Sequence, residues 1–364
     1  MPEGTCCDMA QQGAGARGAR GKRGGGGRGL LAAAVLAAGA LRVGAARAAG
    51  GAGGALPPGM VAMRGGFFQA GADGFYPEEA PVRRAEVGPF AIDAAAVTNA
   101  EFGAFAGGVP PRYTTDAEHF GDSFAPYWLV PKSMAAAVER AVADAQWWLP
   151  VPGASWHSPE GPGSDLRGRE DHPAVHVSHR DASAFCAWAG KRLPSSDEWE
   201  YAARGGLEGA AYPWGRSEDG LSSRANTFEG IFPEPDAEPA DGCRATCPSR
   251  SFPPNAFGLY NMVGNVWEWV ATEAPAPSGR VAQGGGAGPP PFFLRGGSYM
   301  CHRSYCHRYR VSALTAATAD SSASHYGFRC ALSLGGPGAP PGAVFAEDSP
   351  GVGAQGLGAE EGEL

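Results

Sequence analysis

The pattern of apolar and polar positions predicts three short amphipathic helices with marked N-termini. Each begins with Ser or Thr followed three residues later by Glu or Asp, which is the arrangement of an N-terminal capping box. The boxes are Thr98–Glu101, Ser178–Asp181 and Ser195–Glu198. The buried face of the second helix comprises Ala182, Phe185, Cys186 and Ala189. A fourth, Ala-rich helix is predicted over residues 133–146.

The remaining pattern predicts short strands and long connections. A strand and turn are expected over residues 61–69, and the Pro-interrupted stretch from there to Ile92 reads as loop with, at most, short edge strands. After Gly205, brief apolar runs alternate with Gly, Pro and Asn up to Leu332, and residues 271–291 read as an exposed low-complexity loop. The expected class is therefore α+β, with little regular secondary structure.

Composition separates one folded region from its flanks. The 364 residues include 57 Gly and 32 Pro, roughly twice ordinary usage, whereas the aromatic residues are almost confined to the middle of the chain. A fully disordered chain, a collagen and a polytopic membrane protein are thereby excluded. We expect a single domain over 60–333, a Gly/Ala-rich linker over 46–59 and a disordered acidic tail over 334–364.

The first 45 residues have the pattern of a targeting segment. Basic residues between Arg17 and Arg28 precede an apolar run, Leu30–Leu41, and small residues follow at Val43 and Ala45. This predicts a signal peptide and the endoplasmic reticulum lumen or secretory pathway, with an organellar transit peptide as the alternative. The apolar run is too short for a stable membrane span. A formal net charge of −8 argues against nucleic acid as a partner.

Two of the eight cysteines lie in the leader, and six remain in the mature chain. Two of these, Cys301 and Cys306, lie five residues apart among His302, Arg303 and His307. Spacing alone leaves three readings open. The pair could form a disulfide, it could hold zinc together with His302 and His307, or it could be a redox-active pair suited to Cu(I), because two thiolates are soft ligands.

A second unusual segment holds Asn and Glu beside Trp, in a chain that otherwise drifts toward Gly, Ala and Pro. Hard-cation ligands are offered at alternate positions, and calcium takes six to eight oxygens from such mixed sources. These candidates are Asn261, Gly264, Val266 and Glu268. A further candidate set is Asn226, Thr227, Asp241 and Cys243. The alternative is a Trp-rich core turn whose buried Asn is hydrogen-bonded without a metal.

Taken together, these motifs resemble the formylglycine-generating enzyme family of sulfatase-modifying factors over roughly residues 60–332. The N-terminal carriers are Phe120–Phe124, Trp147–Pro150, Asp171–Pro173, Trp188–Pro194 and Glu198–Tyr201. The C-terminal carriers are Gly258–Asn261, Gly264–Trp269, Gly297–Cys306, Asp320–Ser324 and Gly327–Cys330. The Cys pair resembles the catalytic members, because the family's non-catalytic paralogues lack it.

The resemblance implies a loop-rich, C-type-lectin-like fold and oxidation by O2 and Cu(I). The reaction converts a cysteine, within Cys-x-Pro-x-Arg motifs of unfolded or nascent sulfatases, to Cα-formylglycine. Carried over, Cys301 and Cys306 become the copper ligands and Ser298 adjoins the oxygen pocket. Structural calcium is implied at the two oxygen-rich sets above. The peptide groove would be lined or flanked by Asp122, Trp267, Tyr305 and His325.

The chain also departs from the family pattern. Cys186 and Cys330 match one family disulfide, whereas the positions of the other are Ala203 and Val311, and Cys243 could pair locally with Cys247. A usual acidic residue, an Arg and an Asn are replaced by Ala96, Leu314 and His325. The alternatives are a non-catalytic binding module of the same fold and an iron-dependent sulfoxide synthase, for which residues 60–332 are too short.

Overall fold

A computed structural model describes residues 56–108, 112–138, 145–275, 288–334 and 345–348. The helices are α2 (Asn99–Ala106), α3 (Asp116–Phe120), α4 (Lys132–Ala137), α5 (His179–Trp188) and α6 (Ser196–Arg204). The strands of the first half are β1 (Met60–Met63), β2 (Gly66–Ala70), β3 (Arg83–Val87), β4 (Phe90–Asp93), β5 (Asp122–Pro126) and β6 (Trp148–Pro152). Those of the second half are β7 (Gly230–Ile231), β8 (Glu234–Pro235), β9 (Trp267–Glu273), β10 (Pro291–Arg295), β11 (Leu314–Thr318), β12 (Tyr326–Phe328) and β13 (Ala331–Ser333).

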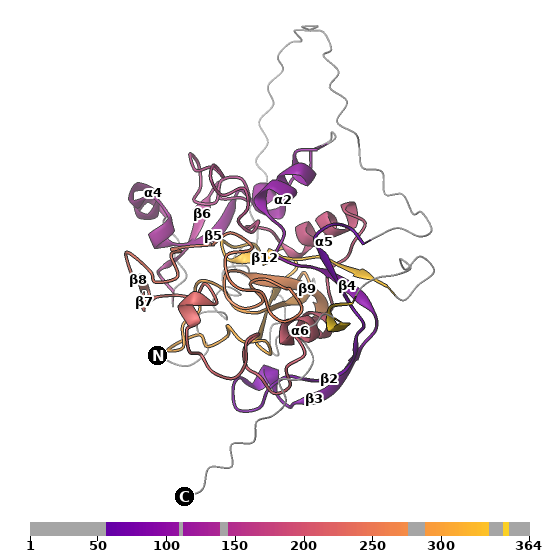
Figure 1. Ribbon diagram of the computed structural model, residues 1–364. Helices are drawn as coiled ribbons and strands as arrows, with labels where there is room; N and C mark the ends of the chain where they lie inside the picture. The colour runs from indigo at the N-terminus through magenta and orange to yellow at the C-terminus, as the bar shows by residue number, and fades with distance from the viewer. Residues whose placement is uncertain (1–55, 109–111, 139–144, 276–287, 335–344, 349–364) are drawn as a thin grey trace, which may run out of the picture.

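Two small sheets form the centre of the domain, and long loops occupy much of the remainder (Figure 1). One sheet has the strand order β11-β10-β9-β12, in which β12 pairs with β9 in parallel. The other has the order β1-β4-β13 and is antiparallel. Three two-stranded pairs lie outside them. This confirms the predicted α+β, loop-rich class.

All three predicted capping boxes are present. The side chains of Thr98, Ser178 and Ser195 each accept a hydrogen bond from the backbone N–H three residues later. The acidic side chain at that later position accepts a hydrogen bond from the backbone N–H of the Ser or Thr. Each box offsets unpaired N–H groups at a helix start and is worth about 1 kcal/mol. A fourth box, Thr115 with Glu118, opens α3, a helix that we did not predict.

Two other predictions need correction. The Ala-rich helix ends at Ala137 instead of continuing to 146; it lacks a side-chain N-cap, and residues 139–144 lie outside the described part. β4, in the stretch expected to hold at most edge strands, is buried at the centre of its sheet. Pro89 directly precedes β4, so the ladder loses no internal donor.

The low-complexity loop predicted over residues 271–291 is bounded by strands. β9 extends to Glu273 and β10 begins at Pro291, and residues 276–287 lie outside the described part.

At both ends of the predicted domain, described residues outside its limits contact it. Leu56, expected in the linker, packs against the β1–β4 sheet. Phe345, expected in the disordered tail, pairs with Ala62, and Glu347 accepts a hydrogen bond from Tyr201 at 2.9 Å. The predicted leader (1–45) and the rest of the tail lie outside the described residues. In the part of the chain that the structure describes, no helix is long and apolar enough to cross a bilayer.

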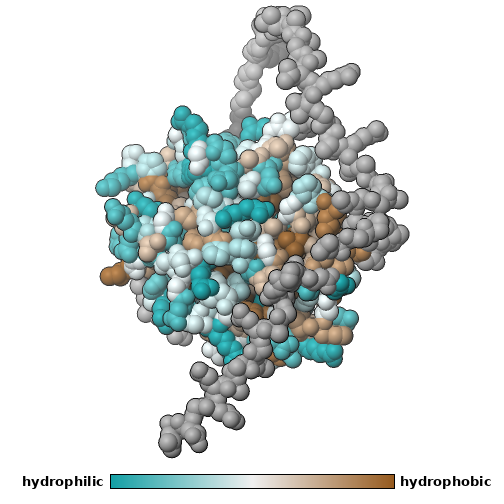
Figure 2. Space-filling view, viewed as in Figure 1, coloured by the Kyte–Doolittle hydropathy of each residue, from teal (hydrophilic) through white to brown (hydrophobic). Residues whose placement is uncertain are grey.

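Two disulfides brace the loop-rich core. Cys186 on α5 is bonded to Cys330 between β12 and β13, across a sequence separation of 144, which confirms the pair that the resemblance implied. Cys243 is bonded to Cys247. Ala203 and Val311, at the positions of the missing family disulfide, are both fully buried in the main hydrophobic core. The outer face shown in Figure 2 is largely hydrophilic, with apolar residues in separate patches.

Candidate active site and cation sites

The two remaining described cysteines lie in one loop that leaves the end of β10. Gly296 and Gly297, both with positive φ, turn the chain there. A Cβ on Gly297 would lie 2.7 Å from the carbonyl oxygen of Arg308, so this close crossing of the two ends of the loop requires glycine. The loop is thus closed by backbone packing next to the sheet.

Cys301 and Cys306 are thiols outside any disulfide, and their Sγ atoms lie 3.1 Å apart. The N–H of Cys301 donates to the Ser298 carbonyl (2.9 Å) and that of Cys306 to the His302 carbonyl (2.8 Å), which fixes both Cα positions. Cys301 is 1 % exposed and Cys306 is fully buried. Two adjacent, nearly dry sulfurs form a ready pair of soft ligands.

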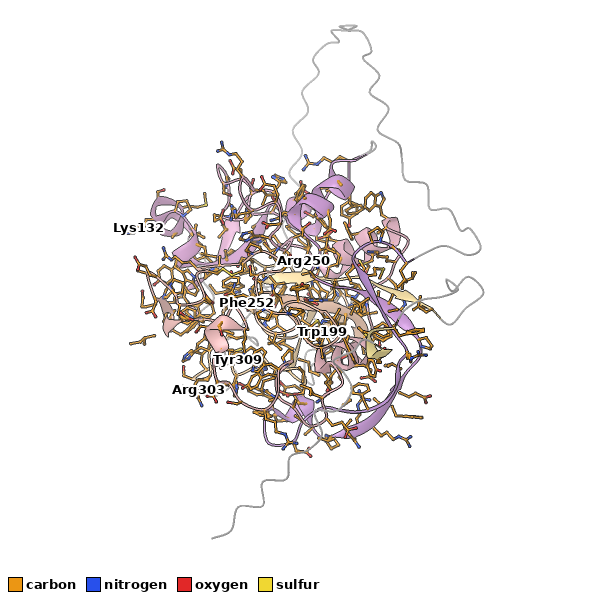
Figure 3. The ribbon with its side chains drawn as sticks, viewed as in Figure 1. Lys132, Trp199, Arg250, Phe252, Arg303 and Tyr309 are labelled. Carbon is orange, nitrogen blue, oxygen red and sulfur yellow. A yellow bond between two sulfur atoms is a disulfide. The ribbon has the colours of Figure 1, made fainter. Side chains whose placement is uncertain are left out.

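The basic residues that follow the thiols are turned toward carboxylates. Arg308 pairs with Glu78 at 2.7 Å, and the fully buried Arg310 pairs with Glu79. Arg303, 70 % exposed, approaches Glu218 together with the hydroxyl of Tyr309; both are labelled in Figure 3. The guanidinium charges next to the thiol pair are therefore neutralised by nearby carboxylates.

The histidines of the loop also have other partners. His307 lies 2.8 Å from Glu218, and burial lowers its pKa. Nδ1 of His302 lies 2.8 Å from the Ser304 hydroxyl. Among the described residues, no group of three or more His, Cys, Asp or Glu side chains is placed to hold a metal. The zinc alternative therefore finds no support, and a metal on the thiol pair would have only the two sulfurs from these side-chain types.

An aromatic cluster adjoins the thiol loop. The Tyr305 ring lies 3.9 Å from that of Phe232, which in turn contacts Trp147 at 4.7 Å and Trp128 at 6.0 Å between centroids. These four rings are half-buried and come from four separate segments. Of them, only Tyr305 was predicted as a groove residue. Phe232 carried no sequence signal, because its role depends on the β7–β8 turn folding back over Tyr305.

Three other residues predicted to line or flank the groove, Asp122, His325 and Trp267, lie on or near β5 and β9. The Ser123 hydroxyl, next to Asp122, lies 2.8 Å from the Ser322 hydroxyl, which brings Asp122 near the segment that carries His325. Burial lowers the pKa of His325 to about 3. The backbone N–H of Trp267 donates to the His325 carbonyl at 2.9 Å. Trp267 is only 1 % exposed, so it supports His325 from inside the core instead of lining a groove.

The first oxygen-rich set has buried oxygens without protein partners. The Asn226 amide group donates to the Ala245 carbonyl (2.7 Å) and to Asn265 Oδ1 (3.1 Å), which turns its own Oδ1 away from both. That Oδ1 and Asp241 Oδ2 are buried without a hydrogen-bond partner in the described structure. Burial raises the pKa of Asp241 to about 6. Unpartnered buried oxygens of this kind suit a hard cation.

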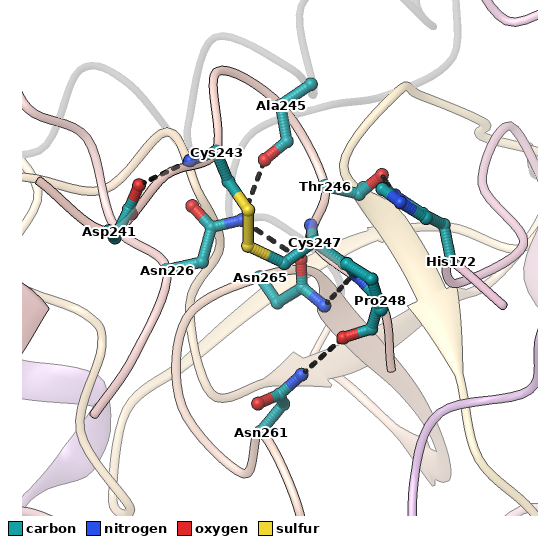
Figure 4. The surroundings of a disulfide bond; sticks show 10 residues. All are labelled: His172, Asn226, Asp241, Cys243, Ala245, Thr246, Cys247, Pro248, Asn261 and Asn265. Carbon is teal, nitrogen blue, oxygen red and sulfur yellow. Dashed lines mark hydrogen bonds between the residues drawn. A yellow bond between two sulfur atoms is a disulfide. The ribbon is translucent and has the colours of Figure 1, made fainter. Parts of the chain in front are cut away.

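Asn265 joins this set to both neighbouring loops (Figure 4). Its backbone N–H donates to the Asn226 carbonyl (2.8 Å), and its carbonyl accepts from Tyr299 (3.0 Å) in the thiol loop. Its side chain exchanges two hydrogen bonds with the backbone of Cys247. The Cys243–Cys247 disulfide and the Asn226 segment are therefore held together by one side chain that we did not predict.

The second oxygen-rich set is divided between two roles. Asn261 Oδ1 is buried without a partner in the described structure, as a cation ligand would be. Glu268, in contrast, is held at 2.7 Å by Arg329 through both oxygens and by the Trp199 indole N–H. A Cβ on Gly264 would lie 2.3 Å from the Asn226 carbonyl oxygen, so the two oxygen-rich segments meet here.

Of the three departures from the family pattern, the Ala96 substitution is compatible with its apolar surroundings. It packs in a small apolar cluster with Val175 and Val266, where an unpaired carboxylate would be costly. A cavity of about 320 Å³ next to Ala96 is lined by Lys191 and Arg250 among others, and by none of the predicted thiol-loop residues.

The fold and the family are shown by comparison with known proteins. The structure of PvdO from Pseudomonas aeruginosa matches with a TM-score of 0.50 and 25% identity, covering 76% of this chain and 94% of that one. The chain therefore shares the fold of that protein.

A family model described as sulfatase-modifying factor enzyme 1-like domain matches residues 49–334. A formylglycine-generating enzyme of Thermomonospora curvata is 47% identical, covering 76% of this chain and 94% of its own length, and one of Bos taurus is 45% identical, covering 76% and 75%. The inactive C-alpha-formylglycine-generating enzyme 2 of Bos taurus is 43% identical, covering 78% and 90%. The chain belongs to the formylglycine-generating enzyme family.

Proposed function

We propose that this protein is an active formylglycine-generating enzyme that uses O2 and Cu(I) on a cysteine in Cys-x-Pro-x-Arg motifs of unfolded sulfatases. The observation that carries the proposal is the pair of buried thiols outside any disulfide, 3.1 Å apart. The inactive relative shows that family membership alone does not decide activity. The thiol pair favours the enzyme over a non-catalytic module of the same fold.

Cys301 and Cys306 would hold the copper ion. Two soft sulfur ligands fit Cu(I), and the absence of a third described His, Cys, Asp or Glu ligand leaves room for a substrate thiolate. Bound copper(I) would supply the one-electron chemistry that O2 needs to react with a thiol. Ser298, fully buried, would form part of the adjoining wall, and its hydroxyl oxygen accepts from the Met300 N–H at 3.3 Å.

The protein's own side chains would bind and desolvate the peptide. The rings of Tyr305, Phe232 and Trp147 offer an apolar surface next to the thiol loop, suited to proline and aliphatic side chains of a substrate. The carboxylate of Asp122 would attract the arginine of the motif. Asp122 begins β5, and the hydroxyl of the next residue, Ser123, contacts that of Ser322 in the segment that leads to His325. The buried thiols are shielded from water, which limits side reactions during turnover.

We also propose structural calcium at the two oxygen-rich sets, with Asn226, Thr227, Asp241 and Cys243 in one and Asn261, Gly264, Val266 and Glu268 in the other. The partnerless oxygens of Asn226, Asp241 and Asn261 support this proposal.

The pattern of the first 45 residues supports our proposal that the protein enters the secretory pathway. A fusion of residues 1–60 to a reporter tests this: secretion of the reporter supports it, and import into an organelle contradicts it.

Turnover requires an electron balance. Converting the substrate thiol to an aldehyde with loss of hydrogen sulfide removes two electrons, whereas reducing O2 to two waters takes four. The assay must therefore supply two further electrons from an external dithiol, which becomes a disulfide. The full chain, loaded with Cu(I), is incubated with a Leu-Cys-Thr-Pro-Ser-Arg peptide, and aldehyde is measured by mass spectrometry. Aldehyde that requires O2, copper and the peptide cysteine supports the proposal; peptide binding without aldehyde would favour the non-catalytic module.

A further inference from the structure

Glu229 has a buried carboxylate oxygen that the predicted sites leave unexplained. It lies three residues after Asn226, and its Oε2 accepts a hydrogen bond from the backbone N–H of Ala240. Its Oε1 is buried without a hydrogen-bond partner in the described structure. Leaving a buried carboxylate oxygen unsatisfied costs free energy, so this oxygen needs a cation or a donor.

Two further oxygens in the same place share this property. Ala240 directly precedes Asp241, whose Oδ1 accepts from the Cys243 N–H at 2.8 Å and whose Oδ2 is buried without a partner. Asn226, which is 1 % exposed, contributes its own partnerless Oδ1. The side chain of Asn226 is fixed through its amide nitrogen, so its oxygen cannot turn to an alternative donor without breaking two bonds.

The two carboxylates act on each other without a compensating protein cation. Glu229 Oε2 accepts from the N–H of Ala240, the residue directly before Asp241, which places the two carboxylates close together. None of the ion pairs between described residues includes Glu229 or Asp241. Two nearby carboxylates in a partly buried loop repel each other, and a cation bound between them would remove that repulsion.

We propose that Glu229 is an additional ligand of the Asn226–Asp241 cation site, which therefore presents two carboxylates and one amide oxygen to a hard divalent ion such as calcium. The inference rests on the proposed calcium role and adds a residue outside the predicted ligand set. Calcium affinity rises with the number of charged ligands, so the second carboxylate makes this site tighter and more selective for divalent over monovalent ions.

The site is directly connected to the thiol loop. Phe228, between the ligands Asn226 and Glu229, donates its backbone N–H to the carbonyl of Cys301 at 3.0 Å. A cation that holds Asn226 and Glu229 therefore also fixes the segment on which Cys301 rests. Glu229 is thus a positioning residue for the thiol pair as well as a cation ligand.

The test compares Glu229→Gln with Glu238→Gln in the full chain. Glu238 lies in the same loop but is exposed, and it serves as the matched control. Calcium chloride is titrated into each chelator-treated protein by calorimetry. We expect Glu229→Gln to weaken calcium binding at one site by roughly tenfold or more, and Glu238→Gln to bind as the wild type does. Unchanged calcium affinity in Glu229→Gln would overturn the inference.

Thermal unfolding separates a ligand from a merely structural residue. In chelator, Glu229→Gln removes a like charge, so we expect it to melt no lower than the wild type, whereas its rise in melting temperature on adding calcium is smaller. A residue that only accepts from Ala240 would lower melting equally with and without calcium, which would contradict the inference. If the wild type itself shows no calcium-dependent rise, the calcium proposal fails; aldehyde formation is measured separately and tests the enzyme proposal.

Discussion

Replacing Glu268 by Gln separates the ion pair seen in the structure from the calcium role that we propose for the same carboxylate. Glu268 and Arg329 form a buried ion pair whose side chains are 2 % and 0 % exposed, with Arg329 Nε and Nη2 each 2.7 Å from a carboxylate oxygen. Gln is nearly isosteric and can still accept from Trp199. The substitution therefore removes the negative charge and leaves the Arg329 guanidinium buried without a counter-ion.

The cost follows from that uncompensated charge. Breaking a buried ion pair by neutralising one partner costs about 3–5 kcal/mol. Arg329 keeps two carbonyl acceptors, Tyr260 at 2.8 Å and Asp93 at 3.2 Å, so we expect a value near 3 kcal/mol. For a domain of this size, each kcal/mol corresponds to roughly 2–4 °C, which predicts a melting temperature about 6–12 °C lower.

The assay is thermal unfolding of the full chain at one scan rate, in chelator and in calcium, with Glu238→Gln as an exposed control. The ion-pair reading predicts that Glu268→Gln melts well below the wild type even in chelator. If Glu268 acted only through calcium, the two proteins would melt together in chelator and differ only when calcium is present. Coincident melting in chelator would thus refute the reasoning.

Three further predictions concern the disulfides, acid stability and the peptide surface. Because a disulfide that closes a longer loop restricts the unfolded chain more, replacing both cysteines of Cys186–Cys330 by Ala should lower the free energy of unfolding by about 5 kcal/mol, and replacing those of Cys243–Cys247 by about 2 kcal/mol. Chemical denaturation measures both values, and equal losses would contradict this account. Burial lowers the pKa of His176 to about 3, below the unfolded value of about 6.5, so the stability it contributes is present above pH 6.5 and lost on acidification, by about 2 kcal/mol at pH 5. His176→Asn, which suits the left-handed φ of 57°, should therefore lose about 2 kcal/mol less than the wild type between pH 7.5 and 5; an identical pH dependence would refute this. Phe232→Ala should raise KM for the peptide with little change in kcat, and an unchanged KM would remove Phe232 from the binding surface.

Local signals predicted the elements that depend on local chemistry. The capping boxes at Thr98, Ser178 and Ser195 begin helices where expected, because a capping box requires only two residues three positions apart. The helix predicted over 133–146 is present but ends at Ala137, and it has no side-chain cap that would support it locally.

Tertiary relations were less accessible. Six cysteines allow fifteen full pairings, and only the family resemblance pointed to Cys186–Cys330. Phe232 and Glu229 gave no distinct signal, because each depends on loops that meet in space and not along the chain. Asn265 lies in the Gly264–Trp269 motif, but its contacts with Asn226 and Cys247 could not be foreseen. The thiol pair stood out at once, since two cysteines five apart are a local pattern, but the Arg partners Glu78 and Glu79 could not be foreseen.

The most direct test of the central claim is aldehyde formation by Cys301→Ser and Cys306→Ser, measured beside the wild type on the same peptide with Cu(I), O2 and dithiol. The account predicts aldehyde from the wild type, none above background from either variant, and unchanged binding of the peptide by all three proteins in the absence of copper. Aldehyde formed at the wild-type rate after loss of either thiol would contradict it.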